Sequence, residues 1–296
     1  MKLIDYTTLL LLGAIWGASF LFMRIASPEM GAVGLVSVRM VSAALFLLPL
    51  WFVAENFKLI KHHWKWLLVV AMLSNVIPFG LLAFSSTRLE AGFTSLINAT
   101  TPVWTAFAGF AFFAERITRQ QIFGLLLAFF GVFILSADRL SFTSDGPGWA
   151  ILAGLTATFC YGLSMHIVKH HLQSVAPMAI SVGAISFAAI FLFLPGVLFW
   201  PAHNVSMVAW VSALLLGVLC TGVAFLLFYP LIKRTGPMIS ATITFLVPVF
   251  AITWGVLILD EVLTSQMMVG MLVTFSGTAF VLRMFSGLAQ KFSRKT

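Results

Sequence analysis

Long apolar segments follow one another along almost the whole chain of 296 residues, and they restrict the possible fold more than any other feature. A helix needs about 20 apolar residues to cross the hydrocarbon core of a bilayer. Ten segments meet this need, and they lack the strand-like alternation expected of a membrane barrel. They are residues 7–26, 32–53, 66–86, 91–113, 120–137, 149–168, 177–200, 208–230, 237–259 and 266–285. We therefore predict an all-α polytopic membrane protein with ten transmembrane helices.

The composition supports this class and argues against enzymes. Charged residues make up 9% of the chain, whereas soluble domains carry about 25%. The sequence has no Ser/His/Asp set and no glycine-rich phosphate loop, so we expect neither catalysis nor a bound cofactor. The histidine pairs 62–63 and 170–171 are adjacent and do not face one way on a helix, so we also expect no metal site.

The distribution of Lys and Arg predicts the orientation in the membrane. With a cytoplasmic N-terminus, 13 of the 17 basic residues would fall on the cytoplasmic side. Such an excess is typical of the inner side of a membrane. We therefore predict that both termini are cytoplasmic, and that the net charge of +8 reflects topology and not nucleic-acid binding. The expected partners are the lipid bilayer and a small-molecule substrate, and the chain is expected to be a monomer or a homodimer.

An internal repeat with an offset of 146 residues divides the chain in two. Pro102 corresponds to Pro248, and Glu115 corresponds to Glu261. The same offset pairs glycine 109 with 255, 124 with 270 and 131 with 277. The predicted halves are residues 1–145 and 146–296, with five helices each. Because five is odd, the second half must enter the membrane inverted relative to the first, as in transporters built from inverted repeats.

The two prolines indicate where a site would lie. Each falls in the middle of a predicted span and leaves the carbonyl four residues earlier, at Asn98 or Thr244, without its helical hydrogen bond. Interrupted helices at corresponding places in two halves point to a transporter's binding site. Polar residues 94, 98, 101 and 105 share one helical face beside Pro102. They either line a cavity or bond their own helix backbone.

Further candidates come from polar and aromatic residues inside the spans. The aromatic residues either stack on a ligand or pack against a neighbour, and Asn75 either lines a cavity or bonds a neighbouring helix. Arg39 either reaches outward to the membrane surface or faces the cavity and attracts a carboxylate. Pro78 has no twin, since position 224 is Ala. The predicted substrate-binding residues are Trp16, Asn75, Phe79, Asn98, Thr101, Trp104, Tyr161, Thr244 and Trp254, and the predicted kink or gating residues are Pro78, Pro102, Pro248 and Arg39.

These features together resemble the drug/metabolite transporter superfamily, EamA type. The motifs that carry the resemblance are Trp16-Gly17 with Ser19-Phe20, Arg39, the two segments that run from Pro102 and Pro248 to their glutamates, and the glycines at 124, 131, 270 and 277. The resemblance implies a central cavity lined by helices 1–4 and 6–9, with the fifth and tenth peripheral. It also implies a location in a bacterial inner membrane, and bacterial aromatic amino-acid exporters are the nearest likeness.

We therefore expect a secondary transporter that exports amino acids, aromatic ones among them, or related small metabolites by alternating access. An alternative is a carrier of another solute class, such as nucleotide sugars or cationic drugs. A structural membrane subunit is the alternative outside transport, and the kinked spans in both halves argue against it.

Overall fold

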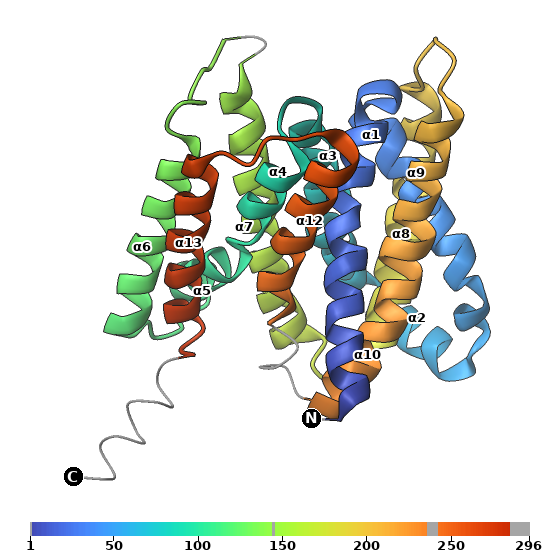
Figure 1. Ribbon diagram of the computed structural model, residues 1–296. Helices are drawn as coiled ribbons and strands as arrows, with labels where there is room; N and C mark the ends of the chain where they lie inside the picture. The colour runs from blue at the N-terminus through green and yellow to red at the C-terminus, as the bar shows by residue number, and fades with distance from the viewer. Residues whose placement is uncertain (1, 144–145, 236–241, 285–296) are drawn as a thin grey trace.

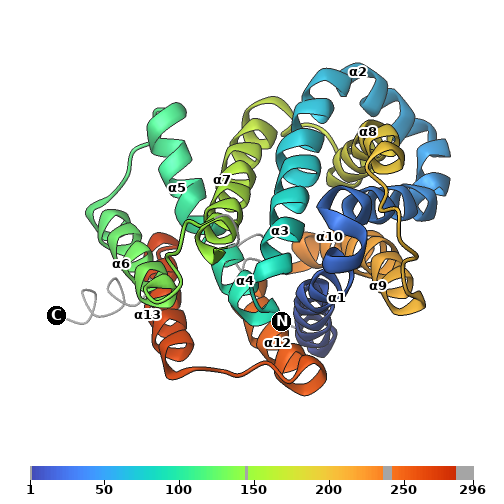
Figure 2. The same cartoon turned by 90° about the horizontal axis from the view of Figure 1, so that it is seen from above.

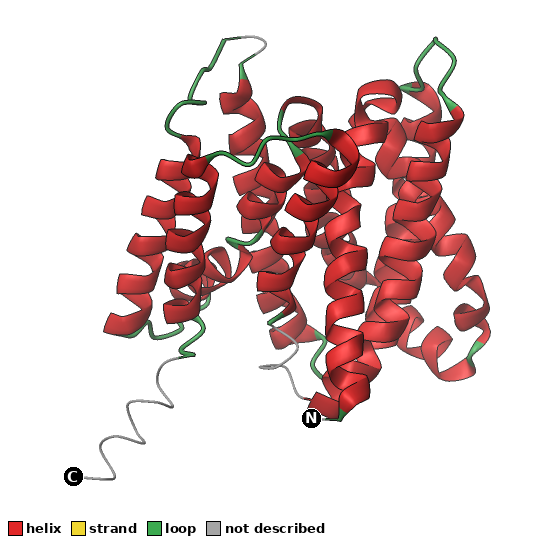
Figure 3. Ribbon diagram, in the orientation of Figure 1, coloured by secondary structure: helices red, strands yellow, loops and turns green. Residues whose placement is uncertain are grey.

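The computed structural model describes residues 2–143, 146–235 and 242–284, and every regular element in these ranges is a helix (Figure 3). Six described stretches are long and apolar enough to cross a membrane, and two shorter apolar helices accompany them. The six are Leu3–Phe52, Glu55–Arg88, Arg119–Ser136, Pro147–His171, Pro177–Leu198 and Met207–Phe228. The all-helical prediction is thereby confirmed for the described residues.

The first two predicted segments form one bent helical run, α1 (Leu3–Leu47). The run bends at Gly31, whose φ of 67° lies in the left-handed region that glycine adopts without a steric penalty. Its 45 residues would measure about 68 Å if straight, which is about twice the hydrocarbon thickness of a bilayer. The run is therefore longer than one crossing needs, and the bend divides it. A short 3₁₀ turn, Leu48–Phe52, ends it.

Residues 54–65, predicted as a connection, are helical instead. They form the first part of α2 (Ala54–Ala71), which bends at His63. This part has exposed apolar residues such as Phe57 alternating with lysines at positions 58 and 61. An exposed face that carries aromatic and basic side chains together suits the membrane–water interface. The lysines of this segment therefore do not prevent a helix, and the prediction of a loop was wrong.

Both halves contain a π turn at the same place in the repeat. In the first half, η2 (Met72–Val76) joins α2 to α3 (Ile77–Arg88). In the second half, η3 (Val218–Val223) joins α9 (Met207–Gly217) to α10 (Ala224–Thr235). Pro78 follows only the first π turn, so the distortion does not need a proline. Single π turns of this kind are frequent at functional sites.

The twin prolines lie in unlike surroundings, which differs from the prediction of two matching kinks. The predicted span 91–113 is broken into α4 (Ala91–Asn98) and α5 (Thr101–Phe112), and Pro102 stands in the first turn of α5. Figures 1 and 2 show α5 extending sideways from the end of α4. In contrast, α12 (Ile243–Leu259) continues through Pro248 as one helix. The predicted beginning of that span, residues 237–241, lies outside the described residues.

Two threonine hydroxyls explain why only the first span breaks. Thr100 donates to the carbonyl of Ile97, and Thr101 donates to the carbonyl of Asn98, both at 2.7 Å. Such bonds offer the backbone an alternative to its helical hydrogen bonds. The corresponding residues of the second half, positions 246 and 247, are Leu and Val, which have no hydroxyl group.

Two helices stand at one side of the bundle, α6 (Arg119–Ser136) and α13 (Ser265–Val281), and they pack on each other (Figure 1). A Cβ atom added to Gly124 would lie 2.7 Å from the carbonyl oxygen of Gly277. The repeated glycines therefore serve a close approach of these two backbones, and the fifth and tenth predicted helices form a pair of their own.

Each half also packs on the other through a glycine. Gly17 of α1 lies against α12, and an added Cβ would be 2.9 Å from the backbone nitrogen of Ala251. Gly162 of α7 (Pro147–His171) lies against α5, and its added Cβ would be 2.9 Å from the backbone nitrogen of Thr105. Ala251 and Thr105 are 146 residues apart. The two crossings are therefore equivalent contacts between opposite halves. The remaining long helix, α8 (Pro177–Leu198), packs against α1 and α2.

Candidate functional site

The interior of the bundle holds an arginine. Arg39, on the second part of α1, is 5% exposed. Its Nε donates a hydrogen bond of 3.1 Å to the hydroxyl of Thr221 in the π turn η3. Its guanidinium carbon lies 3.6 Å from the ring centroid of Phe79 on α3, a cation–π distance. Of the two alternatives for Arg39, the structure favours the one in which it faces inward.

The charge of Arg39 has no acidic partner among the described residues. The ion pairs of the described structure are Asp5–Arg234, Glu90–Arg139 and the pairs of Glu115 with His166 and Lys169. A guanidinium has five N–H donors, and only the bond to Thr221 is present here. A buried charge is costly unless it is paired and hydrogen-bonded. The arrangement therefore suits a ligand that brings a negative charge.

Each of the two π turns carries a buried polar residue, and one of these residues bonds Arg39. Thr221 is buried, accepts from Arg39 and donates its own proton to the carbonyl of Leu216 at 2.9 Å. Its twin Asn75, a predicted site residue, is buried in η2. Phe79 lies one helical turn beyond Asn75. Two elements related by the repeat thus flank a charge that the repeat does not duplicate, since position 185 is Ile.

Two predicted aromatic residues lie beside these elements. Tyr161 on α7 packs edge to face on Phe79, with centroids 6.4 Å apart. Trp16 donates from its indole nitrogen to the carbonyl of Cys220 in η3 at 3.2 Å, and its ring packs on Phe228 at 5.0 Å. Trp16, Phe79 and Tyr161 are therefore gathered around the π turns, as wall residues would be.

The two other predicted tryptophans occupy different places. Trp104 on α5 packs against Phe129 at 5.1 Å and Phe159 at 5.6 Å, on the side of the peripheral helix α6. Its indole nitrogen is buried without a hydrogen-bond partner. Trp254 on α12 donates to the carbonyl of Ala14 at 3.2 Å, so it joins α12 to α1. The structure does not bring either residue into contact with Arg39.

The polar face beside Pro102 mainly bonds its own backbone. The carbonyl of Asn98, expected to be free, accepts the hydroxyl of Thr101, and Thr105 donates to the carbonyl of Thr101 at 2.8 Å. The Asn98 side-chain oxygen, in contrast, is buried without a donor. Thr244 is half-buried on α12. The prediction of a free carbonyl at Asn98 is therefore wrong, because the hydroxyl of Thr101 bonds it.

A groove of about 350 Å³ lies between α1 and α8, and Arg39 is not one of the residues that line it. Apart from Ser186, its walls are apolar. They are formed by Val41, Ala44, Leu45, Leu48, Trp51, Ala189, Ile190 and Phe193. Such a lining suits hydrocarbon chains and offers nothing to bind a charged solute.

Sequence reasoning missed the π turns and the role of Thr221. A π turn changes the hydrophobic periodicity too little to be recognised, and η3 contains no proline that would indicate a distortion. The available signal was the repeat itself, which pairs Asn75 with Thr221 inside two apolar spans.

Comparison with known proteins places this arrangement in a family. The sequence profile described as the EamA-like transporter family matches the chain twice, over residues 4–137 and 148–283. A protein of Escherichia coli (strain K12) described as a probable amino-acid metabolite efflux pump is 24% identical over 287 residues, covering 92% of this chain and 93% of its own length. YvbV, an uncharacterized transporter of Bacillus subtilis (strain 168), is 25% identical over 228 residues, covering 75% of this chain and 73% of its own.

A solved structure shares the fold. A crystal structure that is 15% identical in sequence superposes with a TM-score of 0.65, covering 97% of this chain and 99% of the other. At this identity the likeness concerns the helical arrangement alone. It shows that this fold occurs in a second protein.

Proposed function

The chain belongs to the EamA-like transporter family, and on this basis we propose that it exports amino acids or related small carboxylates, with Arg39 holding the substrate's carboxylate. The observation that carries the proposal is the buried Arg39, which has no acidic partner in the described structure and lies against Thr221 and Phe79. The relative from Escherichia coli, described as a probable amino-acid metabolite efflux pump, supports the same substrate class.

The chemistry of the guanidinium suits this role. Its planar fork of N–H groups matches a carboxylate through two parallel hydrogen bonds, which adds orientation as well as energy. In Arg39 the Nε is held by Thr221 and the face by Phe79, so the remaining nitrogens are the ones left for a ligand. A charge-assisted hydrogen bond contributes about 1.5–3 kcal/mol.

The surroundings of Arg39 suit the remainder of an amino acid. Trp16, Phe79 and Tyr161 offer aromatic faces for an apolar body. We assign the amide oxygen of Asn75, in the first π turn, to the substrate's ammonium group. Because aromatic faces also attract cations, they suit the ammonium group of an amino acid as well as its side chain.

The proposal includes the predicted topology: ten spans, two inverted halves of residues 1–145 and 146–296, and cytoplasmic termini in a bacterial inner membrane. Support comes from the two profile matches and from the equivalent crossings of Gly17 and Gly162. In addition, α1 begins and α13 ends at the same end of the bundle (Figure 1). Alternating access would then be a rocking of the halves about those two glycine crossings.

The test is counterflow transport in proteoliposomes, with amino acids compared with their amides, which lack the carboxylate. Wild-type protein is expected to prefer the acid. Arg39→Ala should lower transport of the acid by about 10–100-fold, the equivalent of one charge-assisted bond, and remove the preference. Arg39→Lys should restore part of it. The matched control is Arg88→Ala, which removes an arginine that lies over Phe84 and contacts no residue of this site.

Two outcomes would contradict the proposal. One is an Arg39→Ala protein that is folded and still prefers the acid to its amide. The other is a wild-type protein that carries organic cations or nucleotide sugars and none of the amino acids, in which case the alternative solute classes would take its place.

A further inference from the structure

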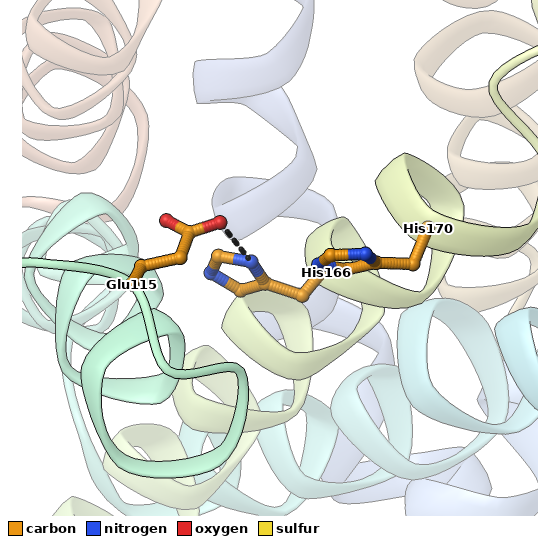
Figure 4. Close-up of side chains that lie close together, drawn as sticks. All are labelled: Glu115, His166 and His170. Carbon is orange, nitrogen blue, oxygen red and sulfur yellow. Dashed lines mark ion pairs between the residues drawn. The ribbon is translucent and has the colours of Figure 1, made fainter.

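A second cluster of polar residues lies away from Arg39, where the end of α5 meets the last turns of α7 (Figure 4). It consists of Glu115, His166 and His170, whose ligand atoms all lie within 4.8 Å of one another. The two histidines are four residues apart and so share one face of α7. Glu115 approaches from the segment that follows α5, on the side of Figure 4 opposite His170.

The hydrogen bonding of His166 leaves one ring nitrogen facing a carboxylate. Its Nε2 lies 2.9 Å from the backbone carbonyl of Thr105. A carbonyl only accepts, so Nε2 carries a proton. In a neutral imidazole the other nitrogen, Nδ1, then has only a lone pair. That Nδ1 is buried without a hydrogen-bond partner and lies 3.3 Å from Oε1 of Glu115. Nδ1 and the carboxylate oxygen would then both be acceptors, and at this distance they need a positive charge between or beside them.

The same hydrogen bond has the form found around metal-bound histidines. A histidine that ligates a metal usually donates its other N–H to a carbonyl or carboxylate, which fixes the tautomer and the ring orientation. Thr105 supplies that carbonyl here. Two histidines at i and i+4 on a helix are a recurring arrangement in zinc sites.

Neighbouring residues hold both rings in place. Phe113 stacks on His166, with centroids 4.8 Å apart, and on His170, with centroids 5.2 Å apart. Gly109 leaves the room that the cluster occupies. A Cβ atom there would lie 2.8 Å from Cε1 of His166 and 2.9 Å from Oε2 of Glu115. The site is therefore shaped by packing and not only by surface charge.

We propose that Glu115, His166 and His170 bind a divalent transition-metal ion of the Zn²⁺ class, with water completing the coordination. Imidazole and carboxylate ligands suit Zn²⁺ and its neighbours in the transition series. Donor atoms around a tetrahedral Zn²⁺ lie about 3.3 Å apart. The cluster must therefore contract, and the exposed His170 would have to slide along its stack with Phe113 to approach the other two.

Lys169 competes for the same carboxylate. Its Nζ donates to Oε1 of Glu115 at 2.6 Å, and its side chain is 63% exposed. A metal would displace the ammonium group of Lys169, which has open solvent to move into. Removing that ammonium group should therefore strengthen metal binding.

The position of the site gives a bound ion a structural consequence. Glu115 belongs to the first half of the chain, and the two histidines belong to the second. The ion would thus join the halves at the end of the bundle where α5 and α7 end. Ligation should accordingly raise the thermal stability of the protein as well as produce a binding isotherm.

The test uses the full chain without a histidine tag, purified in detergent. Zn²⁺ is titrated calorimetrically, and Co²⁺ is used to read the coordination from its visible absorption. Wild type is expected to bind one equivalent and to gain thermal stability with Zn²⁺. His170→Gln and Glu115→Gln should each weaken binding at least about 10-fold. Lys169→Gln should tighten it severalfold.

The matched control is His171→Gln, which alters the next histidine along α7. His171 stacks on Trp66 at 3.5 Å and is not part of the cluster, so binding should be unchanged. His170 is exposed, so its replacement should leave the fold intact.

Absence of Zn²⁺ binding in both wild type and Lys169→Gln would overturn the proposal. So would binding that survives His170→Gln and Glu115→Gln but is lost when His62 and His63 are replaced, because surface histidines would then be the ligands.

Discussion

Glu115 and Glu261 occupy equivalent places in the two halves, and they share a local structure but not their partners. Each follows a residue with positive φ, 53° at Ala114 and 54° at Asp260. Each backbone N–H bonds the carbonyl of the glycine six positions earlier, at 3.0 Å to Gly109 and 3.1 Å to Gly255. Local sequence therefore determines how both helices end.

The partners of these glutamates come from the opposite half. The Glu261 carboxylate accepts the backbone N–H groups of Ala91 at 2.7 Å and Gly92 at 3.3 Å, so it caps α4. Glu115 instead accepts from Lys169 and faces His166. One carboxylate closes a helix end, where a negative charge is favourable, and the other stays available to cations. The comparison teaches that a sequence repeat preserves the end of a helix but not what that end binds.

The largest expected effect concerns the glycines that join the halves. Gly17→Val and Gly162→Val should each lower the free energy of unfolding by at least about 1–3 kcal/mol, because the new side chain meets backbone atoms that cannot move aside. Thermal unfolding in detergent measures the change. Gly80→Val is the control, since nothing lies within 4 Å of a Cβ at that position. If only one of the two variants has a lower free energy of unfolding, the two crossings are not equivalent.

Loss of the α4 cap should come next. Glu261→Ala leaves the backbone N–H groups of Ala91 and Gly92 without their acceptor and should lower the free energy of unfolding by about 1–2 kcal/mol. Hydrogen exchange of those two amides should accelerate at the same time. If exchange stays slow in the variant, another acceptor caps α4 and the contrast with Glu115 disappears.

Relief of backbone strain should produce a smaller change of opposite sign. Ala114→Gly should raise the free energy of unfolding by up to about 1 kcal/mol, because a left-handed conformation costs alanine about 1–2 kcal/mol and glycine almost nothing. Asp260→Gly should gain less, since aspartate tolerates that conformation better. Equal gains in thermal denaturation would mean that the two helix ends are strained alike.

The smallest effect is expected for Glu115. Glu115→Ala should lower the free energy of unfolding by less than about 1 kcal/mol at neutral pH, because the pair with Lys169 is largely exposed. Lys169 lowers the pKa of this carboxyl in the folded protein. Its contribution is therefore present above the ordinary pKa of a glutamate and is lost as the pH falls through the lowered value. Wild type and variant should unfold alike in acid, and a difference that persists there would point to packing.

Much of the fold could be predicted because the length of the apolar segments and the repeat of rare residues can be read directly from the sequence. The bend near residues 27–31 and the helix ends before Glu115 and Glu261 follow from such marks. The unequal fate of the twin prolines could not be predicted from the prolines themselves. It depends on hydroxyls at Thr100 and Thr101, which compete with helical hydrogen bonds in one half only.

The candidate sites were less predictable than the fold. The sequence leaves two directions open for Arg39, outward to the membrane surface or inward, and only the packing of α1 against η3 and α3 distinguishes them. His166 and His170 are four residues apart, and in the sequence His170 stands out only as the neighbour of His171. Their union with Glu115 depends on a crossing between α5 and α7 that sequence spacing does not encode.

The paired π turns let each of these helices lose one residue without a change in the direction of the side chains that follow. A π turn contains about one residue more than an α turn, and one residue rotates a helix by about 100°. Deleting one residue within Val218–Val223 can therefore return the segment to α-helix while keeping the orientation of every side chain in α10. A deletion within the regular part of α9 would instead turn that whole face toward lipid. The π turns are thus the places in each half where chain length can change by one without reassigning the surface of a helix.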